Sequence, residues 1–267
     1  MGIFDGILLC SDFDGTMAHF AKVSQENSEA IRYFQSEGGI FCPCSGRETA
    51  FFRGFTDVFR ANGPIITLNG SKITLYGETP AEDQNLYVGS FPASLALEYA
   101  DRMLHEESVS RVWFHHVDSR VCLSNEGDAA PEWVRPDVVS PASVTENVCK
   151  IVTNHSNTRL PEIRALTEPI YADRFVFGSS WEYGYEAQYI GTDKGSSALR
   201  VKEIVGAHTL VSVGDYENDY LLLKAADISY AVGNAVDCLK EIADRVTVPC
   251  AEHAIARIVE DLRVEFS

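Results

Sequence analysis

Short apolar runs alternate with amphipathic helical patterns at both ends of this 267-residue chain. This alternation predicts a parallel sheet covered by helices on both faces, because parallel strands need helical crossovers between them. The expected fold class is therefore α/β, with a doubly wound parallel sheet. The expected strands are 7–11, 39–44, 65–68, 209–213, 229–232 and 246–248, with a hairpin strand at 72–76. The expected helices are 25–37, 48–61, 196–205, 218–226, 236–243 and 251–263.

The middle of the chain follows a different pattern. Its apolar and polar residues alternate more strictly, as in half-buried strands, and its loops are richer in proline. The expected strands there are 112–117, 148–153, 174–177 and 186–190. We expect a first domain formed by residues 1–80 and 190–267, with a second, α+β domain, residues 81–189, inserted into it.

Charge and hydropathy exclude several classes of protein. The chain has 22 Lys+Arg against 39 Asp+Glu, a formal net charge of −17, which excludes nucleic-acid binding by bulk charge. No apolar run approaches the roughly 20 residues that a membrane span needs. The N-terminus lacks the basic segment of a secretory signal, so the expected location is the cytoplasm. The sequence does not indicate an oligomeric state.

The seven cysteines are an odd number, scattered along the chain and mostly set among apolar residues. This distribution is typical of reduced thiols in a core. The pair in Cys42-Pro43-Cys44 has no second cysteine or histidine pair at the spacing of a zinc site. We therefore expect the cysteines to be structural.

Two acidic clusters each follow a predicted buried strand. The run Asp12-Phe13-Asp14-Gly15-Thr16 places two carboxylates at positions i and i+2 after strand 7–11, and Gly214-Asp215-Tyr216-Glu217-Asn218-Asp219 follows strand 209–213. In a parallel sheet the carboxyl ends of the strands meet at one edge, where ligands bind. The two clusters are therefore expected to open on the same edge.

A single Asp after a strand is usually a turn former or a helix cap. Four converging carboxylates, Asp12, Asp14, Asp215 and Asp219, would however repel one another strongly in a reduced dielectric. A hard divalent cation relieves that repulsion. A small set of oxygen ligands that leaves room for water and phosphate favours Mg²⁺ over Zn²⁺ or a dedicated Ca²⁺ cage.

The order of four motifs resembles that of the haloacid dehalogenase-like (HAD) superfamily, in particular the Cof-like phosphatases with a large α/β cap. The resemblance covers essentially the whole chain and implies a Rossmann-like core. Its motifs one to four are Asp12-Phe13-Asp14-Gly15-Thr16, Ser45-Gly46-Arg47, Lys194 within Thr192–Ser196, and Gly214–Asp219. The segments 231–235 and 243–247 are similar to the C-terminal signature of that group.

The resemblance implies that Asp12 is a nucleophile that forms an aspartyl-phosphate and that Asp14 is the general acid and base. Mg²⁺ would be bound by Asp12, Asp215 and the backbone carbonyl of Asp14. An aspartate at position 14 is typical of the phosphatases and phosphomutases of the superfamily and disfavours dehalogenase activity.

The resemblance also implies a phosphate site. Ser45 of the Ser45-Gly46-Arg47 motif and Lys194 would hold the phosphoryl oxygens, with Lys194 also acting in catalysis. Arg47 either contacts substrate or pairs with a carboxylate. Asn69 either faces substrate or belongs only to an Asn-Gly turn. At the same site, Asn218 and Asp219 would hold the metal ligands and Lys194 in position without binding the metal themselves.

The expected function is Mg²⁺-dependent hydrolysis of a small phosphorylated metabolite, with a sugar phosphate as the substrate class that the family implies. Two alternatives stay open. One is phosphoryl transfer to a second hydroxyl, as in phosphomutases. The other is a regulator that binds a phosphometabolite without turnover, although a regulator needs no acid or base.

Overall fold

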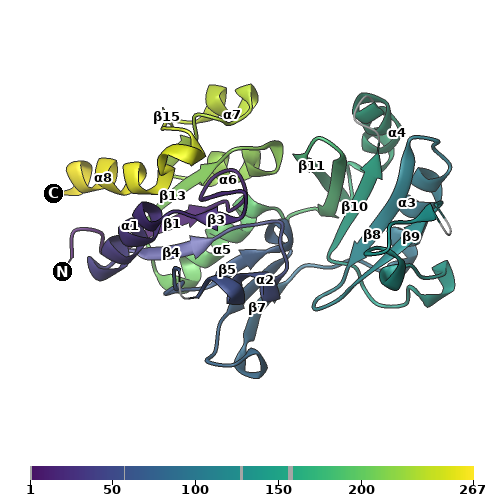
Figure 1. Cartoon of the computed structure of the whole chain (residues 1–267), viewed down its shortest axis with the longest axis horizontal. Helices are drawn as coiled ribbons and strands as arrows, with labels where there is room; N and C mark the ends of the chain where they lie inside the picture. The colour runs from purple at the N-terminus through teal and green to yellow at the C-terminus, as the bar shows by residue number, and fades with distance from the viewer. Residues whose placement is uncertain (1, 57, 127–128, 156–158) are drawn as a thin grey trace. The chain divides into compact units, whose positions relative to one another are not determined.

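A computed structural model of the chain describes residues 2–56, 58–126, 129–155 and 159–267 (Figure 1). The chain forms two compact units. The first comprises Met1–Tyr87 and Asp193–Ser267, and the second comprises Val88–Thr192. The second unit is thus inserted into the sequence of the first.

The first unit is built on a five-stranded sheet in the order β15-β14-β13-β1-β4. All four pairs of neighbouring strands are parallel. Every residue of β1 is buried, as expected for a strand covered on both faces. The strands are β1 (Ile7–Ser11), β4 (Ile40–Pro43), β13 (Thr209–Gly214), β14 (Ile228–Ala231) and β15 (Arg245–Val246).

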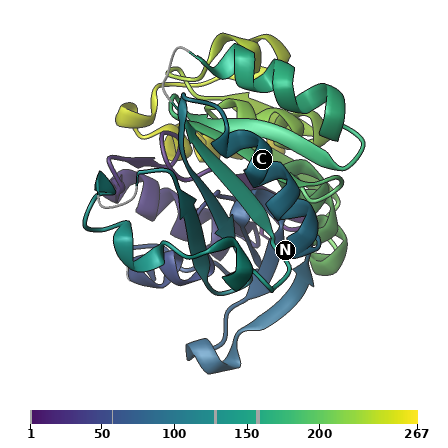
Figure 2. The same ribbon diagram turned by 90° about the vertical axis from the view of Figure 1, so that its right-hand side faces the viewer.

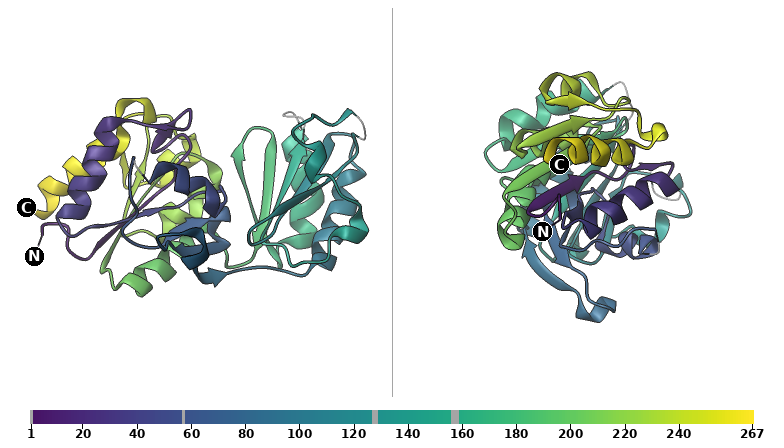
Figure 3. Two further views of the ribbon diagram at one scale, coloured as in Figure 1. Left: turned by 60° about the horizontal axis from the view of Figure 1, so that its bottom comes forward. Right: turned by 90° about the vertical axis from the view of Figure 1, so that its left-hand side faces the viewer.

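Helices cover both faces of this sheet. Leu9 and Val211 belong to the apolar cluster that contains residues of α1 and α8, which lie side by side (Figure 3). Leu8 and Leu210, one position earlier in each strand, belong to the cluster on the opposite face with α5 and α6. The predicted doubly wound α/β core is confirmed. The helices are α1 (Gln25–Ser36), α5 (Lys194–Val205), α6 (Tyr220–Ala225), α7 (Asp237–Ile242) and α8 (Ala254–Phe266).

The expected helix at 48–61 is much shorter in the structure; residue 57 lies outside the described residues. Only α2 (Thr49–Phe52) is α-helical, followed by the 3₁₀ turn Arg53–Phe55. Gly54 lies in that turn and weakens a helix interior by about 1 kcal/mol relative to alanine. Phe51, Phe52 and Phe55 all pack edge-to-face against Phe13. Aromatic packing therefore takes precedence over helical periodicity here.

Two small sheets complete the first unit. The hairpin β2 (Ala18–His19) and β3 (Lys22–Val23) follows the first acidic cluster. The other sheet has the order β5-β6-β7 and comprises β5 (Ile65–Thr67), β6 (Lys72–Leu75) and β7 (Gln84–Val88). The sequence pattern placed residues 81–87 in the inserted domain, whereas they belong to the first compact unit, where β7 joins the sheet of β5 and β6.

The second unit has an antiparallel sheet in the order β11-β12-β10-β8-β9. Helices α3 and α4 pack on one face of it through one shared apolar cluster (Figure 2). On the other face, Trp113, Cys122 and Val152 form a smaller cluster. The elements are α3 (Ala93–Leu104), β8 (Val109–His115), β9 (Arg120–Ser124), β10 (Lys150–His155), α4 (Leu160–Tyr171), β11 (Phe175–Trp181) and β12 (Gly184–Tyr189).

Across the described parts of the chain, none of the helices combines the length and apolarity required to span a bilayer.

Candidate active site

The two acidic clusters meet at the carboxyl edge of the parallel sheet. β1 and β13 are neighbours in register, with Ser11 opposite Val213. Asp12 follows β1 directly, and its backbone N–H donates to the carbonyl of Val213 at 3.0 Å. Asp215 follows β13 directly. The direction of the two strands therefore brings Asp12 and Asp215 to the same edge.

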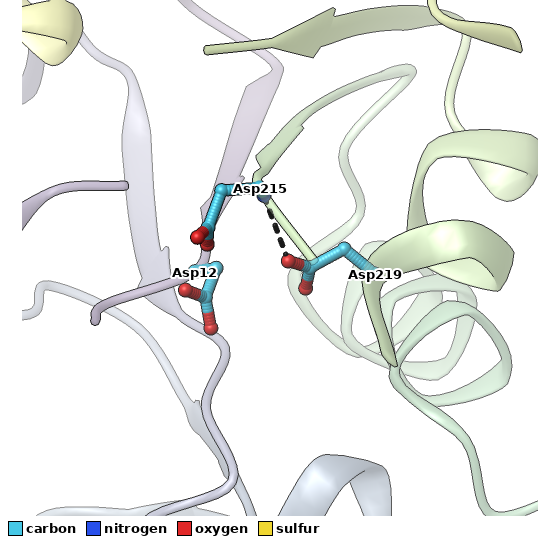
Figure 4. Close-up of side chains that lie close together, drawn as sticks. All are labelled: Asp12, Asp215 and Asp219. Carbon is cyan, nitrogen blue, oxygen red and sulfur yellow. Dashed lines mark hydrogen bonds between the residues drawn. The ribbon is translucent and has the colours of Figure 1, made fainter. Parts of the chain in front are cut away.

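Three carboxylates converge there. Asp12, Asp215 and Asp219 each offer an oxygen within 4.8 Å of the others (Figure 4). Asp219 Oδ2 accepts hydrogen bonds from the backbone N–H groups of Asp215 at 3.0 Å and Tyr216 at 3.3 Å. Asp219 thereby closes the turn that carries Asp215.

Lys194 bridges two of these three carboxylates. It is the first residue of α5, and Asp193 caps that helix by accepting from the backbone N–H of Ser196. The Lys194 side chain is fully buried, and its Nζ donates to Asp12 Oδ1 and Asp219 Oδ1, both at 2.6 Å. Asp219 is thus engaged through both of its oxygens.

Two glycines allow the close approach of these loops. Gly15 has φ +84°, and a Cβ there would lie 2.4 Å from Asp215 Oδ2. A Cβ on Gly214 would lie 2.4 Å from the Cβ of Asp219. Any larger residue at either position would displace a carboxylate of the cluster.

Burial and mutual repulsion shift the pKa values of the cluster. Burial raises the pKa of Asp12 well above its usual range, and Asp219 and Asp215 add to the effect against the opposing charge of Lys194. Burial and the charge of Asp219 raise the pKa of Asp215 to about 6. Burial disfavours the charged form of Lys194, but Asp12 and Asp219 outweigh it and raise the Lys194 pKa. The single positive charge of Lys194 is therefore too small to balance three ionised carboxylates.

This donor set fits a hard divalent cation. It consists of carboxylate oxygens in excess negative charge, which suit Mg²⁺ or Mn²⁺ better than a soft metal. Since both oxygens of Asp219 already accept hydrogen bonds, Asp12 and Asp215 are the better placed ligands. Within the described residues, no other group of three His, Cys, Asp or Glu side chains has this proximity. Cys10, Cys42 and Cys44 lie buried in the apolar core, as expected of structural thiols.

Asp14 lies apart from this cluster. Its side chain is 42% exposed, and it accepts two hydrogen bonds from Arg47, Nε to Oδ2 at 2.8 Å and Nη2 to Oδ1 at 3.0 Å. Of the two roles left open for Arg47, the structure shows the pairing with a carboxylate. No side-chain atom of Asp14 belongs to the carboxylate group around Asp12.

The motif around Ser45 and the Asn69-Gly70 turn border the same edge. Ser45 and Gly46 follow β4, and Ser45 Oγ accepts from the backbone N–H of Arg47 at 3.2 Å. The backbone N–H of Asn69 donates to the carbonyl of Ser45 at 3.0 Å. Asn218 Nδ2 donates to Asn69 Oδ1 at 3.2 Å. These contacts join the second motif to the fourth.

The Asn69-Gly70 turn also supports the start of α5. Gly70 has φ +101°, and a Cβ there would lie 2.2 Å from the carbonyl oxygen of Asp193. Ser197 Oγ donates to the Gly70 carbonyl at 2.6 Å. The turn therefore helps to fix the position of Lys194 at the start of α5.

Two residues that the sequence analysis gave no role also support the site. Thr16 Oγ1 donates to Asp215 Oδ1 at 2.9 Å. Asn234 Nδ2 donates to the Gly15 carbonyl at 2.9 Å, and its Oδ1 accepts from the backbone N–H of Cys250 at 2.7 Å. Both residues lie in segments that the sequence analysis singled out, Thr16 in the first motif and Asn234 in the segment 231–235. That position in the sequence could have indicated a supporting role for each.

Comparison with known proteins finds relatives that match almost the whole chain. A family model described as haloacid dehalogenase-like hydrolase matches residues 9–259. YitU of Bacillus subtilis (strain 168), a 5-amino-6-(5-phospho-D-ribitylamino)uracil phosphatase, is 22% identical over 271 residues, which cover 95% of this chain and 96% of that protein. YcsE of the same organism carries the same activity name and is 24% identical over 260 residues, which cover 94% of each protein.

Solved structures share the fold. The structure described as the HAD subclass IIB sugar phosphatase BT4131 has a TM-score of 0.78 at 18% identity, covering 96% of this chain and 99% of that one. A haloacid dehalogenase-like hydrolase from B. subtilis has a TM-score of 0.79 at 22% identity, covering 95% and 98% of the two chains. At these identities the structural likeness shows the fold alone.

Proposed function

The chain belongs to the haloacid dehalogenase-like hydrolases as a phosphatase of the Cof-like group, and we propose that it hydrolyses a small sugar phosphate or related phosphomonoester with Mg²⁺. The observation that carries the proposal is the cluster of Asp12, Asp215 and Asp219, in which the buried Lys194 bridges Asp12 and Asp219. The relatives support the substrate class, since two are named for a phosphoribityl compound and one is titled a sugar phosphatase.

In the proposed first step, a carboxylate oxygen of Asp12 attacks phosphorus. The new Asp12–phosphorus bond forms as the bond to the leaving oxygen breaks, and Asp14 gives its proton to that oxygen. Lys194 fixes the attacking carboxylate through its 2.6 Å contact with Asp12 Oδ1. An ammonium has three N–H donors, and two of them are directed to Asp12 and Asp219, so the third suits a phosphoryl oxygen.

In the second step, water attacks the phosphorus of the aspartyl-phosphate. Asp14, now a carboxylate, accepts the proton of the water, and the Asp12–phosphorus bond breaks to release phosphate. Asp12 and Asp215 would hold Mg²⁺, with the Asp14 backbone carbonyl as the third protein ligand implied by the resemblance. When bound, the cation would supply positive charge that keeps Asp12 ionised and stabilises the phosphoryl oxygens.

Mg²⁺ is expected to stabilise the protein more strongly as pH rises through about 6. A raised folded-state pKa at Asp215 means that the metal-free folded protein binds more protons than the unfolded chain between about pH 4 and 6. Metal-free stability should therefore fall as pH rises through this window, by up to about 3 kcal/mol, while proton competition for Mg²⁺ disappears. Melting temperatures at pH 5, 6 and 7.5, with and without Mg²⁺, measure the effect.

Asp215→Asn should flatten the pH dependence of the metal-free protein and remove most of the gain from Mg²⁺. A gain in melting temperature that is equal at pH 5 and 7.5 would contradict the assignment of Asp215 as a metal ligand.

The function is tested by measuring phosphate released from a panel of sugar phosphates, nucleotides and cofactor phosphates. We expect release that depends on Mg²⁺, stops with EDTA and is strongest among the sugar phosphates. Labelled phosphate that appears on an acceptor sugar would instead indicate phosphoryl transfer. Binding of phosphometabolites without any release across the panel would contradict the proposal and favour a regulator.

A further inference from the structure

The contact between Arg47 and Asp14 has the geometry of a positioning device. Two parallel N–H···O bonds, at 2.8 and 3.0 Å, join one guanidinium edge to both carboxylate oxygens. Exposed ion pairs usually contribute little, but a two-point contact fixes the orientation of both partners as well as their distance. Asp14 would otherwise be an exposed side chain, free to populate several rotamers.

Arg47 is itself held in place from three sides. Its backbone N–H donates to Ser45 Oγ at 3.2 Å, and its carbonyl accepts from the backbone N–H of Leu68 at 3.0 Å. Its guanidinium lies over the ring of Phe51, with Cζ 4.8 Å from the centroid. Phe51 packs edge-to-face on Phe13, the residue between Asp12 and Asp14. The guanidinium is thus anchored to the same structure that carries Asp12.

We infer that Arg47 is a positioning residue that acts through Asp14, rather than a ligand of the phosphoryl group. This inference rests on the proposed function. Its Nε and Nη2 donors are directed at Asp14, which leaves the strongest two-point edge of the guanidinium unavailable to phosphate. The role of Arg47 is to aim the Asp14 carboxyl group for proton transfer.

The contact weakens and recovers once in each cycle. When Asp14 is protonated, its hydroxyl oxygen carries the proton for the leaving group and accepts from Arg47 more weakly than a carboxylate oxygen does, while the carbonyl oxygen still accepts. After the proton moves to the leaving oxygen, Asp14 is a carboxylate and both of its oxygens again accept strongly from Arg47.

The inference predicts a loss that depends on the leaving group. p-Nitrophenolate departs without a proton, whereas the alkoxide of glucose 6-phosphate needs one. Arg47→Ala should lower kcat/KM for glucose 6-phosphate by about 10- to 100-fold, within the range that a general acid contributes, and for p-nitrophenyl phosphate by less than about 3-fold. Arg47→Lys should recover part of the loss, since one donor can still reach Asp14.

A double-mutant cycle separates this role from a structural one. In the Asp14→Asn background, Arg47→Ala should cause no further loss with glucose 6-phosphate, because the residue through which Arg47 acts is gone. Arg53→Ala is the matched control: Arg53 also pairs with an aspartate, Asp83, and lies over an aromatic ring, Tyr76. Arg53→Ala should leave the ratio of the kcat/KM values for the two substrates unchanged.

Equal losses for both substrates with a raised KM would overturn the inference and make Arg47 a phosphate ligand. Additive losses in the double mutant would overturn it as well. Melting temperatures of all variants show whether a loss comes from unfolding. If the wild-type protein released no phosphate from either substrate, the proposed function would fail and the inference with it; an active wild type with equal losses would refute the inference alone.

Discussion

Asp12→Asn is expected to reduce phosphate release by at least about 1,000-fold, because an amide oxygen cannot replace the carboxylate that attacks phosphorus. The substitution is nearly isosteric, so packing around this buried side chain should persist. Phosphate release from the best substrate of the panel, measured at saturating Mg²⁺, gives the loss. A chemical quench during turnover should trap phosphorylated protein in the wild type and none in the variant.

The same variant should remain folded. Asp12 is one of three carboxylates around a single ammonium, so its neutralisation lowers the repulsion in the cluster while Asp219 still pairs with Lys194. We expect a melting temperature within a few degrees of the wild-type value in the absence of metal. Activity near the wild-type level in Asp12→Asn would remove Asp12 from the role of nucleophile.

Lys194→Met is expected to lower the free energy of unfolding by about 3–5 kcal/mol, more than any of the other substitutions proposed for this protein. The Lys194 side chain is fully buried, and its removal leaves Asp12 and Asp219 buried without their shared cation. Methionine keeps the length and the apolar stem, so the loss reflects charge rather than volume. Urea unfolding without metal measures the change, and phosphate release should fall with it because Asp12 loses its fixed orientation.

Lys202→Met provides the control on the same helix. Lys202 pairs with Asp227 at 2.6 Å, but Asp227 is half-exposed, and such pairs contribute about 0–1 kcal/mol. Its substitution should leave both stability and phosphate release close to wild type. An equal loss in the free energy of unfolding for the two substitutions would show that the buried contacts of Lys194 with Asp12 and Asp219 contribute no more than an exposed ion pair.

The sequence predicted the architecture of the first unit because hydrophobic periodicity follows from burial. A strand such as β1 must be apolar along its whole length when helices cover both faces, and this requirement is visible without coordinates. Strand direction then placed Asp12 and Asp215 at one edge. The prediction was less successful at α2. The expected helix at 48–61 ends at Phe52 and continues as a 3₁₀ turn, in a segment whose aromatic side chains pack against Phe13.

The partners of individual charged side chains were decided only by the tertiary structure. Position along the chain brought Asp14 and Arg47 to the same edge, but whether Arg47 would meet a carboxylate or remain available to substrate depended on rotamers and on the Phe51 ring beneath it. Likewise, only the folded turn engages both oxygens of Asp219, one with Lys194 and one with backbone N–H groups.

The sequence by itself thus determined the fold class, the edge of the sheet where the acidic clusters meet and the family to which the chain belongs. The tertiary structure decided which aspartates approach one another, which of them Lys194 neutralises and which arginine holds Asp14. The physical reason is one of range. Periodicity and strand direction are properties of contiguous residues, whereas ion pairs form between residues such as 12 and 194, whose separation is set by packing to within a fraction of an ångström.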